Sequence, residues 1–282
     1  MPAPPPPSRL VGPALRAVTA VAALTAAYVA FARYTPINSF LFLEHGMDED
    51  LARAIDLAAC VALVAGALGT LFGFRSIARV MGVFVGLWFA AIALTTAVLG
   101  GEPFAHLAPL AHAARYGLPF ALVIWTLGWW SWSEAVLRVS LAATFAVHGY
   151  EALQHHPGFI DLVFLTKLEF ESMFGLAEMP FEEAQARAIL TAIGLLDLVL
   201  AALLLMVRWR AIAVYMAFWG LLTALSRMTA GGLEWWPEVG LRVSHFGGPL
   251  VLWLMWRKRA AAAEAPEPDS PDPLPKSEGA PA

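Results

Sequence analysis

Stretches of about twenty apolar residues recur along the whole chain and constrain its architecture more than any other feature. A helix needs roughly 20 such residues to cross the hydrocarbon core of a bilayer. The sequence therefore predicts an all-α, polytopic membrane protein with eight transmembrane helices. The predicted spans are residues 13–34, 51–73, 77–99, 109–130, 135–156, 185–207, 211–230 and 239–256.

Composition supports the same class. Only 14% of the 282 residues are charged and 59% are hydrophobic, whereas soluble domains carry about 25% charged residues. The single cysteine, Cys60, excludes disulfides and cysteine-rich zinc sites within one chain. Basic patches for nucleic acid are absent, so the expected partner is the lipid bilayer. Residues 1–12 are rich in proline and residues 258–282 in proline and acid, and both are predicted to be disordered tails.

The charges between the apolar stretches alternate in sign. Arginines gather at the N-terminus, at the even-numbered connections and in the "RKR" of residues 257–259, while acidic residues occupy the odd-numbered connections. Positively charged loops stay on the cytoplasmic side of a membrane. This pattern predicts a multi-pass protein of the cytoplasmic (inner) membrane with both termini in the cytoplasm.

Short segments of the first half recur in the second half. "ARAI" at 52–55 returns at 186–189, "LR" at 15–16 returns at 137–138, and "RYGLPF" at 115–120 matches "HFGGPL" at 245–250. These matches predict two tandem four-helix bundles, residues 13–132 and 133–257. Because each unit has an even number of spans, the two copies are expected to share one orientation.

Polar residues gather in the second copy, in "TFAVHGYEALQHH" (144–156). His148, Glu151 and His155 fall within about 60° of one another on a helix, so they form one stripe. Charged groups inside a membrane are costly and often mark function. The first copy has Ala26 and Val29 where the second has His148 and Glu151. The predicted polar pocket, open to the extracytoplasmic side, comprises His148, Glu151, His155, Asp197, Arg227, Arg242 and His245.

Four interpretations of this pocket remain open. His148, Glu151 and His155 have the spacing to bind a transition metal. His148 or Asp197 could exchange protons with a quinone headgroup. Arg227 and Arg242 could clamp an anionic substrate. The same residues could also form a purely structural network of ion pairs.

Two further features accompany the pocket. Residues 158–174 are apolar but too charged to span, which predicts an interfacial helix or a lid on the outer surface. In the first copy, His45, His106 and His112 are expected to be solvated or interfacial. His112 and Arg115 mirror Arg242 and His245 with the two residue types exchanged.

The second copy resembles the DoxX-like family of bacterial inner-membrane proteins. The resemblance lies in "VLRVSLAATFAVHGYEALQHHPGFIDLV" (136–163), "GLLDLVLAALLL" (194–205) and "RVSHFGGPLVLWLM" (242–255). It implies a four-helix bundle and at most a redox-associated role, since some relatives are linked to quinone-coupled sulfur oxidation or oxidative-stress complexes. A doubled bundle departs from the single bundle that is usual in this family.

Together these features predict a redox- or quinone-associated membrane subunit that works with partner membrane or redox proteins. A transporter or channel for a small solute or ion is the competing class, and a non-catalytic assembly subunit is the third. The sequence does not decide whether the protein is an enzyme.

Overall fold

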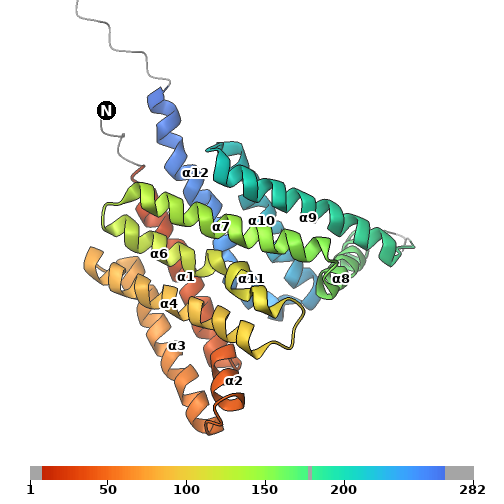
Figure 1. Ribbon diagram of the computed structural model, residues 1–282, viewed down its shortest axis with the longest axis horizontal. Coiled ribbons are helices and arrows are strands. Elements are labelled where there is room, and N and C mark those ends of the chain that lie inside the picture. Colours follow the sequence, from red (N-terminus) through yellow and green to blue (C-terminus); the bar gives the residue numbers. More distant parts are fainter. Residues whose placement is uncertain (1–7, 177–179, 264–282) are drawn as a thin grey trace, which may run out of the picture.

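The computed structural model describes residues 8–176 and 180–263, and these residues form helices joined by short connections (Figure 1). The predicted tails fall mostly outside the described residues, although the first helix begins at Val11 and the last extends to Ala263. The helices are α1 (Val11–Ala32), α2 (Pro36–Leu43), α3 (Glu49–Phe72), α4 (Arg75–Leu99), η1 (Ala105–Leu107), α5 (Ala108–Ala111), α6 (Ala113–Thr126), α7 (Trp130–Leu153), α8 (Pro157–Phe174), α9 (Glu183–Met206), α10 (Arg210–Gly231), η2 (Leu233–Trp235), α11 (Trp236–Leu241) and α12 (Val243–Ala263).

Six helical segments of the described chain are long and apolar enough to cross a membrane. Five of them are the single helices α1, α3, α4, α9 and α10. The sixth, Ala105–Thr126, consists of η1, α5 and α6 together. Two more predicted spans, 135–156 and 239–256, coincide with α7 and with α11 and α12, which are not among the six. The fourth span breaks at His112, where α5 ends and α6 begins.

Large apolar side chains cover the outside of the molecule, and small ones fill the contacts between helices. Val61, Val98 and Phe218 are each more than 60% exposed. The inward face of α1 consists largely of buried alanines, including Ala23 and Ala30. Small residues let helices approach closely, while an apolar exterior suits lipid rather than water.

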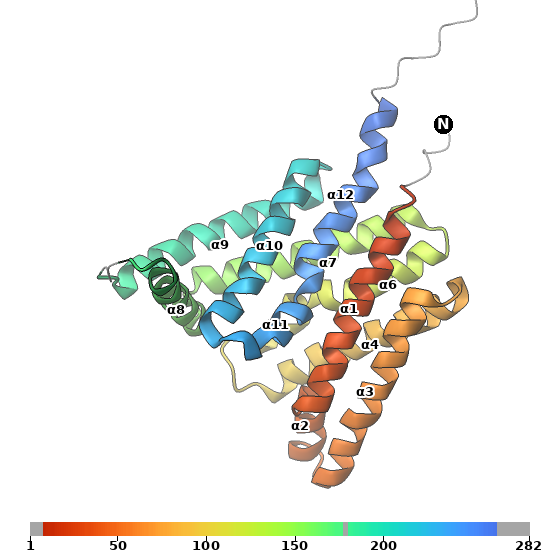
Figure 2. The same cartoon turned by 180° about the vertical axis from the view of Figure 1, so that it is seen from behind.

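The order of long and short helices in the first half recurs in the second half. Each half has a long helix, a second helix of 8 residues in α2 and 18 in α8, two long helices, a 3₁₀ turn, a short helix and a last helix, from α1 to α6 and again from α7 to α12. α1 packs on α3 as α7 packs on α9, and α4 packs on α6 as α10 packs on α12. Between the halves, α6 contacts α7 and α1 contacts α12 (Figure 2).

Arginine side chains donate hydrogen bonds to carbonyl oxygens at the C-terminal ends of α3 and α9. The last carbonyl groups of any helix lack partners within that helix. Arg16 of α1 donates to the carbonyl oxygen of Gly73, at the end of α3, over 2.7 Å. Arg138 of α7 donates to the carbonyl oxygens of Leu204 at 2.8 Å and Leu205 at 2.6 Å, at the end of α9.

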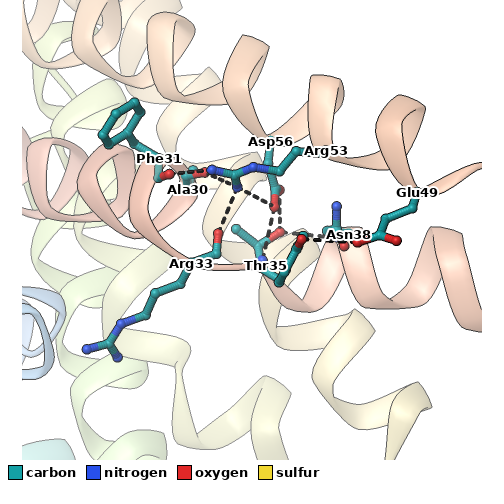
Figure 3. Close-up of polar contacts among 9 residues, drawn as sticks. Ala30, Phe31, Arg33, Thr35, Asn38, Glu49, Arg53 and Asp56 are labelled. Carbon is teal, nitrogen blue, oxygen red and sulfur yellow. Dashed lines mark hydrogen bonds and ion pairs between the residues drawn. The ribbon is translucent and has the colours of Figure 1, made fainter.

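A second network joins the opposite end of α1 to α3 (Figure 3). Arg53 donates to the carbonyl oxygens of Ala30 and Arg33, both at 2.9 Å, and to that of Phe31. The neighbouring carboxylate of Asp56 accepts hydrogen bonds from Thr35 N at 3.0 Å and Thr35 Oγ1 at 2.6 Å.

α2 is a helix that the span pattern alone does not predict. Thr35 caps it by accepting from Asn38 N, and Pro36 occupies the first turn. A capping threonine followed by proline is a start signal for a helix. α8 begins in the same way, because His156 accepts from Gly158 N and Pro157 follows it.

Backbone contact between two glycines sets the distance between α7 and α9. A Cβ on Gly194 would lie 2.6 Å from the carbonyl oxygen of Gly149, and one on Gly149 would lie 2.9 Å from that of Gly194. A change of side-chain rotamer cannot relieve such a contact, because the atom that the added Cβ would meet belongs to the backbone of the facing helix. The two helices therefore pack as closely as they do only with glycine at both positions.

Gly194→Ala should destabilise the protein by about 1–3 kcal/mol, the usual cost of overpacking. The reason is that α9 must move away from α7 to admit the methyl group. Thermal unfolding of the detergent-purified protein measures the effect. Leu195→Val is the control, since Leu195 is 55% exposed on the outer face. Equal unfolding temperatures for the two variants would contradict the proposed close contact.

Candidate functional site

A cavity of about 640 Å³ lies in the second half of the chain, between α7, α8, α9, α10 and the start of α12. Most of its wall is apolar, with Phe145, Leu162, Ile193 and Leu222 among the side chains that line it. Small-molecule sites have this size and this mainly apolar lining, with a few polar groups to orient the ligand.

α8 forms one wall of the cavity. The sequence predicts an interfacial helix or lid over 158–174, and the structure has a helix from Pro157 to Phe174. Phe159, Leu162, Thr166 and Phe170 recur on one face of this helix and line the cavity. On the same helix, Lys167 Nζ pairs with Glu171 Oε2 at 2.7 Å.

Five of the seven predicted pocket residues line this one cavity, although they come from four helices and a helix junction. His148 is on α7, Asp197 on α9, Arg227 on α10, Arg242 at the junction of α11 and α12, and His245 on α12.

The polar groups gather around the rings of His148 and Phe159. The ring centres of His148 and His245 are 5.7 Å apart, and those of His148 and Phe159 are 6.2 Å apart. The guanidinium carbon of Arg227 lies 5.8 Å from the ring centre of Phe159. This arrangement gives the apolar cavity one polar end.

The other two predicted residues have different positions. Glu151 lies behind His148, with its Oε2 3.0 Å from His148 Nδ1. His155 points elsewhere, since its Nε2 lies 3.1 Å from Thr191 Oγ1 and its Nδ1 lies 3.5 Å from Arg187.

The structure does not bring the three predicted metal ligands together. Within residues 8–176 and 180–263, no group of three His, Cys, Asp or Glu side chains is placed to hold a metal ion. His148 and Glu151 bond to each other, and His155 bonds to Thr191 instead of joining them.

Asp197 has a partner that the sequence does not reveal. Trp219 Nε1 on α10 donates to Asp197 Oδ1 over 3.0 Å, and both residues line the cavity. Trp219 lies in an ordinary apolar stretch, and only the packing of α10 beside α9 shows its role.

Residues of the first half reach the back of the polar end. The sequence predicts His112 to be solvated or interfacial, but its Nδ1 is buried. Arg115 is only 8% exposed and lies within electrostatic range of Arg242, Glu238 and Arg227. His112 and Arg115 belong to the turn between α5 and α6, and the contact of α6 with α7 brings that turn to the site.

Several buried nitrogens at this end have no hydrogen-bond partner among the described residues. They are His112 Nδ1, Arg115 Nε, Arg227 Nε and His245 Nε2. Buried polar groups without partners cost about 1–3 kcal/mol each. Their concentration beside one cavity indicates that a ligand or water supplies the missing acceptors.

One ion pair organises this corner. Arg242 Nη1 donates both to the carboxylate of Glu238 and to its carbonyl oxygen, the latter over 3.1 Å. Burial raises the pKa of the Glu238 carboxyl, but Arg242, with smaller contributions from Arg115 and Arg227, outweighs it and lowers the pKa overall.

At the corresponding place, the interior of the first half is packed with apolar side chains. Ala26 takes the position of His148, and Leu63 takes that of Asp197 when the two "ARAI" segments are aligned. Ala26 and Leu63 pack with Val85 and Phe89 in a buried apolar cluster. The same arrangement of helices is thus filled by apolar side chains in one half and left hollow and polar in the other.

Comparisons with protein-family models, curated proteins and solved structures find no match for this chain. The interpretation of the site therefore rests on its geometry.

Glu238→Gln should lower the free energy of unfolding by about 2 kcal/mol at neutral pH, because Arg242 loses its charged acceptor. A group with a lowered pKa stabilises the fold above its unfolded pKa, and this contribution disappears as the pH falls. The difference between wild type and variant should therefore be largest above pH 4.5, the ordinary value for this carboxyl, and shrink below it.

Thermal unfolding across a pH series measures this difference. Glu234→Gln is the matched control, since Glu234 is exposed in the same region. A pH-independent difference would contradict the assigned role of Glu238.

Proposed function

We propose that the chain is a DoxX-like, multi-pass protein of a bacterial inner membrane, with eight spans in two tandem, parallel bundles. The recurring order of helices supports this architecture, and so do Arg16 and Arg138, which close equivalent helix ends. α7 and α12 would be the two additional spans, and both termini would be cytoplasmic. α7 carries Glu134, Arg138, His148 and Glu151, and these residues lower its hydropathy.

Cysteine labelling tests this topology. In a Cys60→Ser background, Glu49→Cys places a thiol at the beginning of α3 and Ser76→Cys places one at the beginning of α4, and both positions are exposed. An impermeant maleimide should label Glu49→Cys on intact cells, and Ser76→Cys only after permeabilisation. The reverse pattern would invert the proposed orientation.

For the second half we propose a quinone-binding role within a redox-associated membrane subunit. The observation that carries this proposal is an apolar cavity of about 640 Å³ whose polar end includes His148, which is paired with Glu151 outside the cavity wall. A quinone matches such a site, because its ring and tail are apolar and its carbonyl oxygens accept hydrogen bonds. The apolar walls would surround the ring, and the polar end would bind the carbonyl groups.

The His148–Glu151 pair suits proton exchange with such a ligand. An ionised carboxylate only accepts hydrogen bonds, so Glu151 holds the proton of His148 on Nδ1. Nε2 is then the ring nitrogen available to the ligand, and its N–H donates to a quinone carbonyl oxygen when His148 is doubly protonated. Reduction of a quinone takes up two protons and two electrons. His148 and Asp197 would supply protons at the cavity, and a partner redox protein would supply the electrons.

His148→Ala should abolish or weaken quinone binding by at least about tenfold, the loss expected for one buried hydrogen bond to a charged group. His155→Ala is the matched control, because His155 lies just beyond the end of α7 and its Nε2 is 3.1 Å from Thr191 Oγ1, outside the cavity. Isothermal titration of the detergent-purified chain with decylubiquinone measures both. Unchanged binding in His148→Ala, or no binding by wild type, would overturn the proposed function.

A further inference from the structure

A second cavity, of about 610 Å³, lies at the opposite end of the first half. α1 and α7 begin there and α3 ends there, so it is separate from the proposed quinone site. Arg9, Arg16, Arg75, Trp125 and Trp130 are among the residues that line it. Among its described lining residues there is no aspartate or glutamate.

The second half has a carboxylate at the equivalent place. Glu134 lies one turn before Arg138, as Gly12 lies one turn before Arg16. Glu134 Oε1 accepts from Arg208 Nε at 2.7 Å and from Trp256 Nε1 at 3.0 Å. Arg138 Nη1 lies 3.9 Å from the same oxygen. In this half the chain itself supplies the anion between two arginines and an indole.

The first half repeats the donors without the acceptor. Arg16 closes the end of α3 as Arg138 closes the end of α9. Arg75 follows α3 closely, as Arg208 follows α9. Trp256 donates its indole N–H to Glu134 in the second half. In the first half the indole nitrogen of Trp125 lies in the comparable place, 3.1 Å from the position of a Cβ on Gly12.

Glycine at position 12 therefore leaves open the space that the Glu134 side chain fills in the other half. Among the described residues, nothing accepts a hydrogen bond from Trp125 Nε1, and Arg9 and Arg75 are exposed at the rim. Three cations and an indole N–H thus surround a space that holds no internal anion.

We propose that this cavity binds a phosphate group from outside the chain, in the position that the Glu134 carboxylate occupies in the second half. Arginine binds phosphate through paired, charge-assisted hydrogen bonds. The cavity is much larger than a carboxylate and opens at the end of apolar helices, where lipid headgroups and tryptophans meet. The phosphate could belong to an anionic phospholipid or be free, and the two sources share this chemistry.

Native mass spectrometry of the full chain in detergent tests the proposal. Phosphatidylglycerol, diacylglycerol with the same acyl chains, and inorganic phosphate are titrated separately, and phosphate is then added in competition with the lipid. Wild type should bind one phosphatidylglycerol at least about tenfold more tightly than diacylglycerol, since two or more charged hydrogen bonds to the phosphate distinguish them. Displacement by phosphate identifies free phosphate as a ligand as well, whereas resistance identifies the lipid headgroup as the source.

Two variants locate the site. Gly12→Glu introduces a carboxylate at the position equivalent to Glu134. It should abolish binding of phosphatidylglycerol, because the carboxylate occupies the place of the phosphate. Trp125 must shift slightly to admit the new Cβ. Arg75→Gln, at an exposed position, should weaken binding at least about tenfold and keeps the test valid if Gly12→Glu does not fold. Arg33→Gln is the matched control, because it removes an exposed cation at the other end of α1.

Wild-type affinity in both Gly12→Glu and Arg75→Gln would overturn the proposal. Equal binding of phosphatidylglycerol and diacylglycerol would also overturn it, since apolar contact alone would then explain the lipid.

Discussion

The carbonyl groups at the ends of the long helices depend on arginines for their hydrogen bonds. In an apolar environment an unsatisfied backbone group costs several kcal/mol. Arg16 and Arg138 satisfy such groups at the ends of α3 and α9, and Arg53 does so at the end of α1. Each of these arginines belongs to the neighbouring helix of a pair. The hydrogen bonds therefore fix the axial register of the two helices in each pair. This register determines which side chains meet between the helices.

With the helix pairs fixed in this way, the interior of each half is free to differ. The first half fills its centre with Ala26, Leu63 and their apolar neighbours, whereas the second half has a cavity with His148 and Asp197 in its wall. At the opposite end the difference is reversed. There the second half is complete, with Glu134 between its arginines, and the first half has Gly12 and an open space. Each half carries one hollow where the other is filled.

Several parts of the fold and site follow from local sequence patterns. Apolar stretches of about twenty residues predict the long helices, and Thr35-Pro36 is a local start signal for α2. His148 and Glu151 are three residues apart on one helix, so their contact needs no tertiary information. The sequence predicts His155 on the same stripe, but α7 ends at Leu153 and His155, with a φ of 52°, lies beside Thr191 of α9 instead. Spacing on one helix cannot predict such a neighbour.

The sequence by itself determined an all-helical chain, the apolar helices and most of the polar residues that meet at one cavity, because helical periodicity and hydropathy are local properties. Only the tertiary structure decided which of those residues share a wall. The packing of α6 on α7 brings Arg115 and His112 of the first half to the site, and that of α10 beside α9 brings Trp219 to Asp197. Contacts between residues far apart in the chain depend on how whole helices pack, and no local pattern encodes them.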